Sequence, residues 1–213
     1  MKGIESLRAK VSRQEENRVF NTVENYDGEA SFLRPNRAIL ELRKQDNASV
    51  FEKFICTGNF LYEFNQAKRE IRVHELPPPK NGKAVEDNFL SFLFGMKAEE
   101  AKSRYNLSVY KLDPNYIYLK IEPISAADKV DFKVAYLALN NATFLPRTLV
   151  FDQPNGNRVK WDLPAIDTTV QLNPALFGKP KPEQGWTVKN MPRQELSTRS
   201  NQPPPRVVRP QQK

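Results

Sequence analysis

The segment between Asp87 and Lys97 constrains this chain most, because it is apolar on every side of any helix that it could form. A helix that is apolar all round must be buried or must cover an apolar surface. Glu86 and Asp87 suit a helix N-terminus and Gly95 suits its end. We therefore expect a buried helix over residues 85–94, followed by an amphipathic helix over residues 97–105.

Most of the remaining sequence alternates between apolar and polar residues, which is typical of strands with one buried face. Asp27-Gly28 between two such runs predicts a hairpin turn. Pro77-Pro78-Pro79 ends the first group of strands, because proline cannot continue a ladder. The expected strands cover residues 18–26, 29–33, 37–44, 50–57, 60–64, 70–76, 106–112, 116–122, 132–139, 144–152 and 158–163. Residues 168–172 are a further candidate strand, and a short helical turn is expected at 174–177.

These roughly ten or eleven short strands are too many for a small two-sheet sandwich with helices inserted midway. One strongly bent antiparallel sheet around the central helix fits better, since a two-faced sheet needs a cover for its apolar face. The predicted fold class is α+β and mostly β: a strongly curved antiparallel sheet, or half-barrel, with a central helical plug or lid.

The chain has 213 residues and a net charge of +8, and that charge is unevenly distributed. Six basic residues and one acidic residue lie between Lys189 and Lys213, so the other 188 residues carry only +3. This end is also rich in proline and poor in large apolar groups, which is typical of disorder. We predict one domain over residues 1–188 and a disordered, basic, proline-rich tail over residues 189–213. A specific nucleic-acid partner is not expected, because few aromatic residues accompany the charges.

No apolar run approaches the length of a membrane-spanning helix, about 18 residues. The first residues, Met1 to Arg8, contain no apolar core of a secretory signal. Two interpretations stay open: the protein is cytoplasmic, or the given start lies inside a longer exported precursor.

Enzyme chemistry finds little support in the sequence. Cys56 is the only cysteine and His74 the only histidine, which excludes an intramolecular disulfide and an ordinary zinc site. Cys56 is interpreted as a small buried strand residue. Glycine-rich phosphate loops and nucleophile motifs are absent, and no carboxylate pair has a spacing that indicates acid–base catalysis. We expect no enzyme activity, no catalytic residues, no metal and no cofactor.

Several motifs together resemble the LolA/LolB superfamily of periplasmic lipoprotein carriers, and most closely a LolA-like domain family typical of planctomycetes. These motifs are Arg34-Pro35-Asn36 at the end of a strand, the run Cys56–Phe64, the run Leu119–Pro123, the hairpin Phe151-Asp152 to Gly156-Asn157, and Gln184-Gly185-Trp186. The resemblance covers about residues 7–188. Phe60 stands where these carriers have tryptophan, and an export signal is missing.

The resemblance implies a half-barrel closed by helices, whose apolar cavity takes the acyl chains of lipoproteins without any reaction. It implies a periplasmic or cell-envelope location, a monomer and a membrane-associated partner. Arg34 matches the carriers' cavity arginine, which hydrogen-bonds the helical lid. A strand end at the surface is the competing interpretation of Arg34.

The leading hypothesis is therefore noncatalytic binding of a lipid or of lipoprotein acyl chains. The alternative is a scaffold, interaction or sensor module with the same fold and a filled core. The candidate ligand-binding residues, for which plain core packing is the alternative, are Arg34, Leu40, Leu42, Phe60, Tyr62, Phe89, Leu90, Phe92, Leu93, Met96, Leu119 and Ile121.

Overall fold

A computed structural model describes residues 4–76, 98–126 and 128–192. Apart from α2 and three short 3-10 turns, the regular structure in these residues is β-strand. The elements are β1 (Ser6–Asn17), β2 (Thr22–Leu33), β3 (Arg37–Lys44), β4 (Asn47–Cys56), β5 (Phe60–Asn65), η1 (Gln66–Lys68), β6 (Glu70–Glu75), α2 (Ala98–Arg104), β7 (Tyr105–Leu112), β8 (Tyr116–Pro123), η2 (Asp128–Val130), β9 (Val134–Asn140), β10 (Pro146–Asp152), β11 (Arg158–Asp167), η3 (Pro174–Phe177) and β12 (Thr187–Met191).

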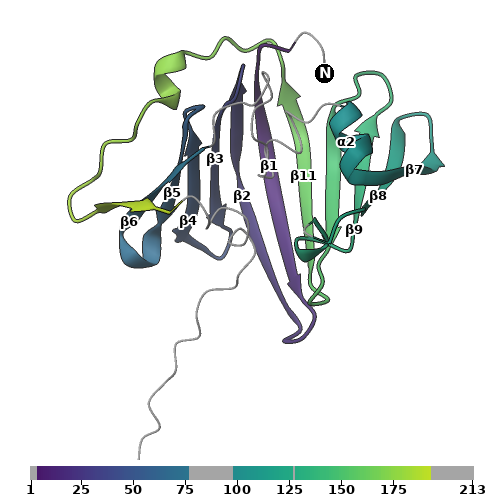
Figure 1. The fold of residues 1–213 in the computed structure, drawn as a ribbon, viewed down its shortest axis with the longest axis horizontal. Helices are drawn as coiled ribbons and strands as arrows, with labels where there is room; N and C mark the ends of the chain where they lie inside the picture. The colour runs from purple at the N-terminus through teal and green to yellow at the C-terminus, as the bar shows by residue number, and fades with distance from the viewer. Residues whose placement is uncertain (1–3, 77–97, 127, 193–213) are drawn as a thin grey trace, which may run out of the picture.

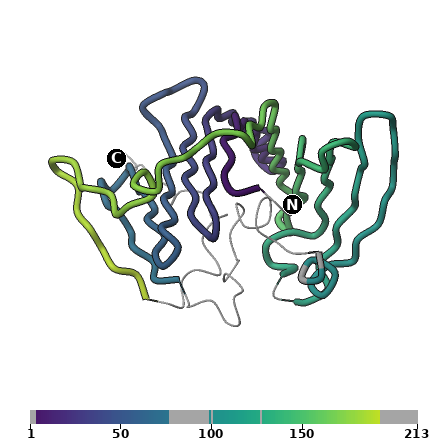
Figure 2. Tube along the Cα trace, turned by 90° about the horizontal axis from the view of Figure 1, so that it is seen from above, coloured from purple at the N-terminus to yellow at the C-terminus, as the bar shows by residue number. Residues whose placement is uncertain are grey.

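All twelve strands form one sheet in the order β12-β6-β5-β4-β3-β2-β1-β11-β10-β9-β8-β7. Neighbours are antiparallel except β12, which runs parallel to β6. The sheet is open and curls into a trough (Figures 1 and 2). This confirms the predicted curved, mostly β architecture, with one more strand than the upper end of the predicted range.

The hairpin predicted at Asp27-Gly28 is wrong. β2 runs straight through both residues, and Gly28 pairs with Leu42 of β3. The turn lies earlier, where the Asn17 side chain accepts the backbone N–H groups of Val19 and Phe20, each at 3.1 Å. Gly28 is instead needed for close approach, because a Cβ there would lie 1.8 Å from the carbonyl oxygen of Glu41.

Two strands, β1 and β12, were not predicted from the sequence, and both add to the strand order of the sheet. β1 joins the two halves of the sheet, since it pairs with both β2 and β11. β12 extends to Met191 and so spans the predicted boundary at residue 188, while the division into a domain and a tail stays a prediction. Residues 168–172 are not a strand. α2 confirms the second predicted helix, whereas the first, over residues 85–94, lies outside the described residues.

The register divides the sheet into two faces. We call the inner face the one that carries the main apolar cluster, and the outer face the opposite one. The inner face is the concave one: α2 lies on the concave side (Figure 2), and Phe132, which follows η2, packs on inner-face Phe151 at a ring distance of 5.3 Å.

The chain after β11 covers the outer face of one half of the sheet. It crosses to the opposite end of the sheet (Figure 1), and the Ser6 hydroxyl donates a hydrogen bond to the Val170 carbonyl. Phe177 in η3 is buried, and η3 lies against β3. Trp186 then packs its ring 5.7 Å from that of Phe64. This segment buries a second apolar cluster: Ile55, Tyr62, Ile71 and Val73.

Candidate functional site

The inner face carries one continuous apolar cluster from β4 to β8. Its strand positions follow the period of two, and its members are almost completely buried. Several of them are alanines at the centre of the sheet, which leave more room above the sheet than larger side chains would. The buried members are Leu7, Ala9, Val11, Tyr26, Ala30, Ala38, Leu40, Leu42, Cys56, Tyr105, Ile121, Phe132, Ala135, Leu149, Trp161 and Leu163.

The inner face also carries a buried arginine. Arg13 on β1 donates two hydrogen bonds to the Glu52 carboxylate on β4, at 2.7 and 2.6 Å, and so reaches over β2 and β3. Its guanidinium lies 4.3 Å from the Tyr26 ring centroid and 5.3 Å from that of Trp161. A contact between strands that are separated by two others requires a strongly curved sheet. Because the Arg13–Glu52 pair connects these strands across the concave face, we call it the clamp.

A second carboxylate, that of Glu15, lies beside the clamp, and burial changes its pKa. Arg13 Nε is 3.0 Å from Glu15 Oε1. Burial raises the pKa of Glu15 above its ordinary value, although the charge of Arg13 acts in the opposite direction. Sequence reasoning missed Arg13 because it did not predict β1. The available signal was the continuation of the alternating positions Leu7, Ala9 and Val11 by Arg13.

Four of the predicted ligand-binding residues share the inner face. Leu40, Leu42 and Ile121 are buried members of the main cluster, and Leu119 packs against it. Phe60 and Tyr62 do not join them: β5 places both on the outer face, where Tyr62 belongs to the second cluster. Phe89, Leu90, Phe92, Leu93 and Met96 lie outside the described residues.

Arg34 lies in the turn between β2 and β3. Its side chain is 43% exposed, and its Nη1 lies 3.9 Å from the Glu5 carboxylate. The backbone N–H of Arg34 also donates to the Glu5 carbonyl at 2.9 Å. The location agrees with a strand end at the surface, which was one of the two interpretations of this residue.

Cys56 is a buried strand residue, as predicted. Burial raises the pKa of its thiol, which makes the nucleophilic thiolate scarce at neutral pH. Its Sγ lies 3.2 Å from the Asn36 carbonyl oxygen, to which the thiol donates. In the described ranges, no group of three or more His, Cys, Asp or Glu side chains could hold a metal ion.

Asp128 joins α2 to the loop that precedes β9. It accepts hydrogen bonds from Arg104 at the end of α2 and from Ser125, the latter at 2.7 Å. Burial acts to raise the pKa of Asp128, but the hydrogen bonds and the charge of Arg104 outweigh it, so the pKa lies below its ordinary value.

This depressed pKa predicts that α2 loses its attachment in acid. The stabilisation is fully present above the ordinary aspartate pKa, about 3.9, and is lost as pH falls through the lower folded-state value. The protection of the α2 and η2 amides against hydrogen exchange, relative to the intrinsic rate at each pH, should therefore fall below about pH 4 in the native protein. In the Asp128→Asn variant, this protection should be low at every pH, and an unchanged acid dependence would contradict this role.

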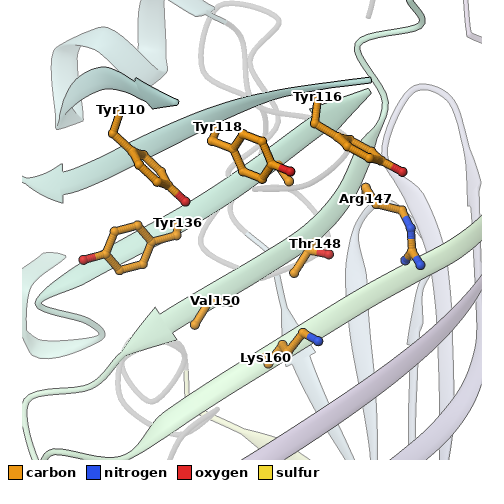
Figure 3. A pocket seen from close by; sticks show the side chains of 9 residues that line it. Tyr110, Tyr116, Tyr118, Tyr136, Arg147, Thr148, Val150 and Lys160 are labelled. Carbon is orange, nitrogen blue, oxygen red and sulfur yellow. The ribbon is translucent and has the colours of Figure 1, made fainter. Parts of the chain in front are cut away.

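The outer face of the other half contains a hollow that the sequence did not indicate (Figure 3). Its volume is about 340 Å³, at the lower end of the range for ligand pockets. Aromatic rings from β7, β8 and β9 line one side, and cationic side chains from β10 and β11 line the other (Figure 3). The lining residues are Tyr110, Tyr116, Tyr118, Tyr136, Ala138, Arg147, Thr148, Val150 and Lys160.

No model of a known protein family and no curated protein sequence matches the chain. Among solved structures, an uncharacterised conserved protein from Thermus thermophilus is similar over 89% of this chain and 92% of that one, with 12% identity and a TM-score of 0.53. A putative outer membrane lipoprotein-sorting protein domain from Vibrio parahaemolyticus covers 83% of this chain and 90% of its own, with 11% identity and a TM-score of 0.42. A LolA superfamily protein from Nitrosomonas europaea covers 83% and 91%, with 12% identity and a TM-score of 0.41.

The structure is one open, curled antiparallel sheet with an apolar concave face, which is the architecture that the sequence resemblance predicts. The relation to the LolA/LolB superfamily, and the closer relation to its planctomycete family, stay predictions. Among the described residues, none of the helices has the length and apolar character required to cross a membrane.

Proposed function

We propose that this protein binds an apolar ligand, a lipid or the acyl chains of a lipoprotein, on the inner face of the sheet, and that it catalyses no reaction. The observation that carries this proposal is the continuous apolar inner face of a single open sheet. In a sandwich, a second sheet would cover such a face. Within the described ranges, all twelve strands belong to one sheet.

The energetics favour an acyl chain as the ligand. Each methylene that leaves water contributes about 0.8 kcal/mol, so half of a fatty acyl chain supplies ample affinity. The clamp and the ion pairs of β5 and β6 give the trough a polar end and a polar edge, where Arg72 pairs with Glu63 at 3.3 Å. A ligand with a long apolar body therefore fits the central strands better than a polar one.

The proposal extends to the cell envelope, where a monomeric carrier would receive its cargo and pass it to a membrane-associated partner. Leu76, which packs against the inner cluster, directly precedes residues 77–97. A lid or plug formed by Phe89, Leu90, Phe92, Leu93 and Met96 stays a prediction, as does the role of Arg34 in opening.

Arg34→Leu tests the carrier role, because this exposed position can change without disturbing the core. We expect the variant to retain a fluorescent long-chain fatty acid several-fold longer or shorter than the native protein, with a melting temperature that is nearly unchanged. Dissociation would be measured by stopped-flow competition with unlabelled fatty acid.

Arg8→Leu is the matched control, since Arg8 is exposed on the outer face of β1. It should leave retention unchanged. Equal retention by the native protein and both variants would contradict the role of Arg34, and the absence of saturable fatty-acid binding would contradict the proposed function itself.

The alternative is an interaction module with the same fold and a filled core. The near-complete burial of Leu7, Ala9, Leu42 and Leu149 favours it. The two functions differ in what accompanies the purified protein: a carrier brings lipid with it, and a module with a filled core does not.

A further inference from the structure

The hollow on the outer face of β7–β11 is lined by tyrosines and cationic side chains, which have no role in the binding of an apolar ligand on the inner face. Three ring pairs connect its four tyrosines: Tyr116–Tyr118 at 6.1 Å, Tyr110–Tyr118 at 6.0 Å and Tyr110–Tyr136 at 5.6 Å between centroids. Tyr110 is 53% exposed, so part of this aromatic surface faces solvent. Ring distances of this size are those of mutually packed aromatic side chains, which form a fixed surface.

The hydroxyl groups of these rings are available for a ligand. Among the described residues, Tyr118 is the tyrosine of the hollow that is engaged, through a hydrogen bond with the Asp113 side chain that raises the pKa of Tyr118. The pKa of Asp113 is lowered mainly by the backbone N–H of Asn115, and the bond with Tyr118 acts in the same direction. The hydroxyls of Tyr110, Tyr116 and Tyr136 have no hydrogen-bond partner in the described part of the chain. The aromatic side of the hollow therefore combines ring faces with hydroxyls that can both donate and accept hydrogen bonds.

The opposite side of the hollow carries an excess of positive charge. Lys160 Nζ lies 2.8 Å from Asp162, and Arg147 Nη1 lies 3.7 Å from the same carboxylate. Thr148 also donates a hydrogen bond to Asp162 at 2.7 Å. One carboxylate thus faces two cations, and both cationic side chains are partly exposed, Arg147 by 37% and Lys160 by 44%. A partly exposed guanidinium beside a partly exposed ammonium is suited to a carboxylate or another oxyanion.

From this arrangement we propose that the hollow binds a saccharide that carries a carboxylate, of the uronic-acid class. The apolar C–H face of a sugar ring would lie on the tyrosines, and its hydroxyls would meet those of Tyr110, Tyr116 and Tyr136. The carboxylate would lie beside Arg147 and Lys160. It would not lie over the rings, because an aromatic face repels negative charge.

The other ligand classes fit less well. A basic or proline-rich segment, such as the end of this chain, meets unbalanced positive charge at Arg147 and Lys160. An acyl chain would remove water from the hydroxyls of three tyrosines and from the partly exposed Arg147 and Lys160 without offering them a hydrogen bond, which costs free energy. An acidic peptide would satisfy the cations but would use the aromatic side poorly.

The test is isothermal titration of the full-length protein with tetragalacturonate, with maltotetraose as the neutral saccharide and tetraglutamate as the acidic peptide. We expect saturable binding of tetragalacturonate, and binding of the other two at least tenfold weaker. Arg147→Gln should weaken tetragalacturonate binding about tenfold, or about 1.4 kcal/mol. Tyr110→Ala should weaken it by a similar factor.

Two control variants remove the same chemical groups elsewhere. Arg8→Gln removes an exposed outer-face arginine on β1, and Phe20→Ala removes an aromatic side chain that is 61% exposed in the β1–β2 turn. Neither should change the affinity, and circular dichroism should show that all four variants are folded. No binding of tetragalacturonate, equal binding of tetraglutamate or maltotetraose, or equal losses in the control variants would each overturn the proposal. Should Tyr110→Ala fail to fold, Tyr110→Phe removes the hydroxyl alone and should still weaken binding.

Discussion

Arg13→Ala is expected to destabilise the protein by about 3–5 kcal/mol, because removing one partner of a buried ion pair leaves the charge of the other partner uncompensated. Arg13 is 8% exposed. The change removes both hydrogen bonds to Glu52, the guanidinium over the Tyr26 ring and the link from β1 to β4. The loss should lie toward the lower end of this range, because the Glu52 side chain is 35% exposed and water can solvate its free carboxylate. Urea unfolding, followed by tryptophan fluorescence, measures it.

Two comparisons distinguish the clamp from ordinary surface charge. Arg8→Ala, on the outer face of the same strand, should change the free energy of unfolding by less than about 0.5 kcal/mol. Joint replacement of Arg13 by Met and Glu52 by Leu should recover most of the stability, because apolar residues of similar size can substitute for a buried ion pair. Equal effects of Arg13→Ala and Arg8→Ala would refute the clamp.

Leu149→Ala is expected to lower the free energy of unfolding by about 2–5 kcal/mol, the cost of lost burial and of the cavity that remains. Leu149 is 0% exposed on the inner face of β10, and it pairs with Leu137 of β9 and Trp161 of β11. The midpoint of urea unfolding should fall while the slope stays constant, since the amount of surface exposed on unfolding is nearly the same.

Leu112→Ala makes the same chemical change at a position that is 67% exposed. Its effect should stay within about 0.5 kcal/mol. A loss for Leu112→Ala as large as that for Leu149→Ala would mean that the inner face of β10 is not part of the packed core.

Strands with clean alternation could be predicted from the sequence almost to the residue. The range 37–44 is an example, because Ala38, Leu40 and Leu42 alternate with the other residues and all three lie on the buried face of β3. β1 was missed because its last five residues, Arg13 to Asn17, are all polar, so the alternation of Leu7, Ala9 and Val11 stops halfway along the strand. β12 pairs with a strand more than a hundred residues away, and it is flanked by charged and proline-rich sequence.

Asp27-Gly28 shows why a local signal can fail. The pair has the composition of a hairpin turn, but Gly28 meets the need for close approach to the Glu41 carbonyl inside the sheet. The sequence does not distinguish these two uses of glycine, because the second depends on a neighbouring strand. Asn17 and Asn21, which form the actual turn, carry a weaker local signal: the Asn17 side chain accepts backbone N–H groups, and Asn21 has a φ of 51°.

The candidate site was only partly predictable. Leu40, Leu42, Leu119 and Ile121 come together on one face because alternation within each strand places them there. Which face a strand turns inward depends on its register with neighbours, and this register places Tyr62 on the outer face. The clamp depends on sheet curvature, and the tyrosine hollow depends on the register of five strands, so neither could be derived from one strand alone.

Native mass spectrometry of the freshly purified, full-length protein tests the central claim, an apolar ligand on the inner face, most directly. We expect a population of protein that carries one lipid, which organic extraction releases and which long-chain fatty acid replaces in competition. Protein that is free of lipid and that also takes up no added fatty acid would contradict the claim and would favour an interaction module with a filled core.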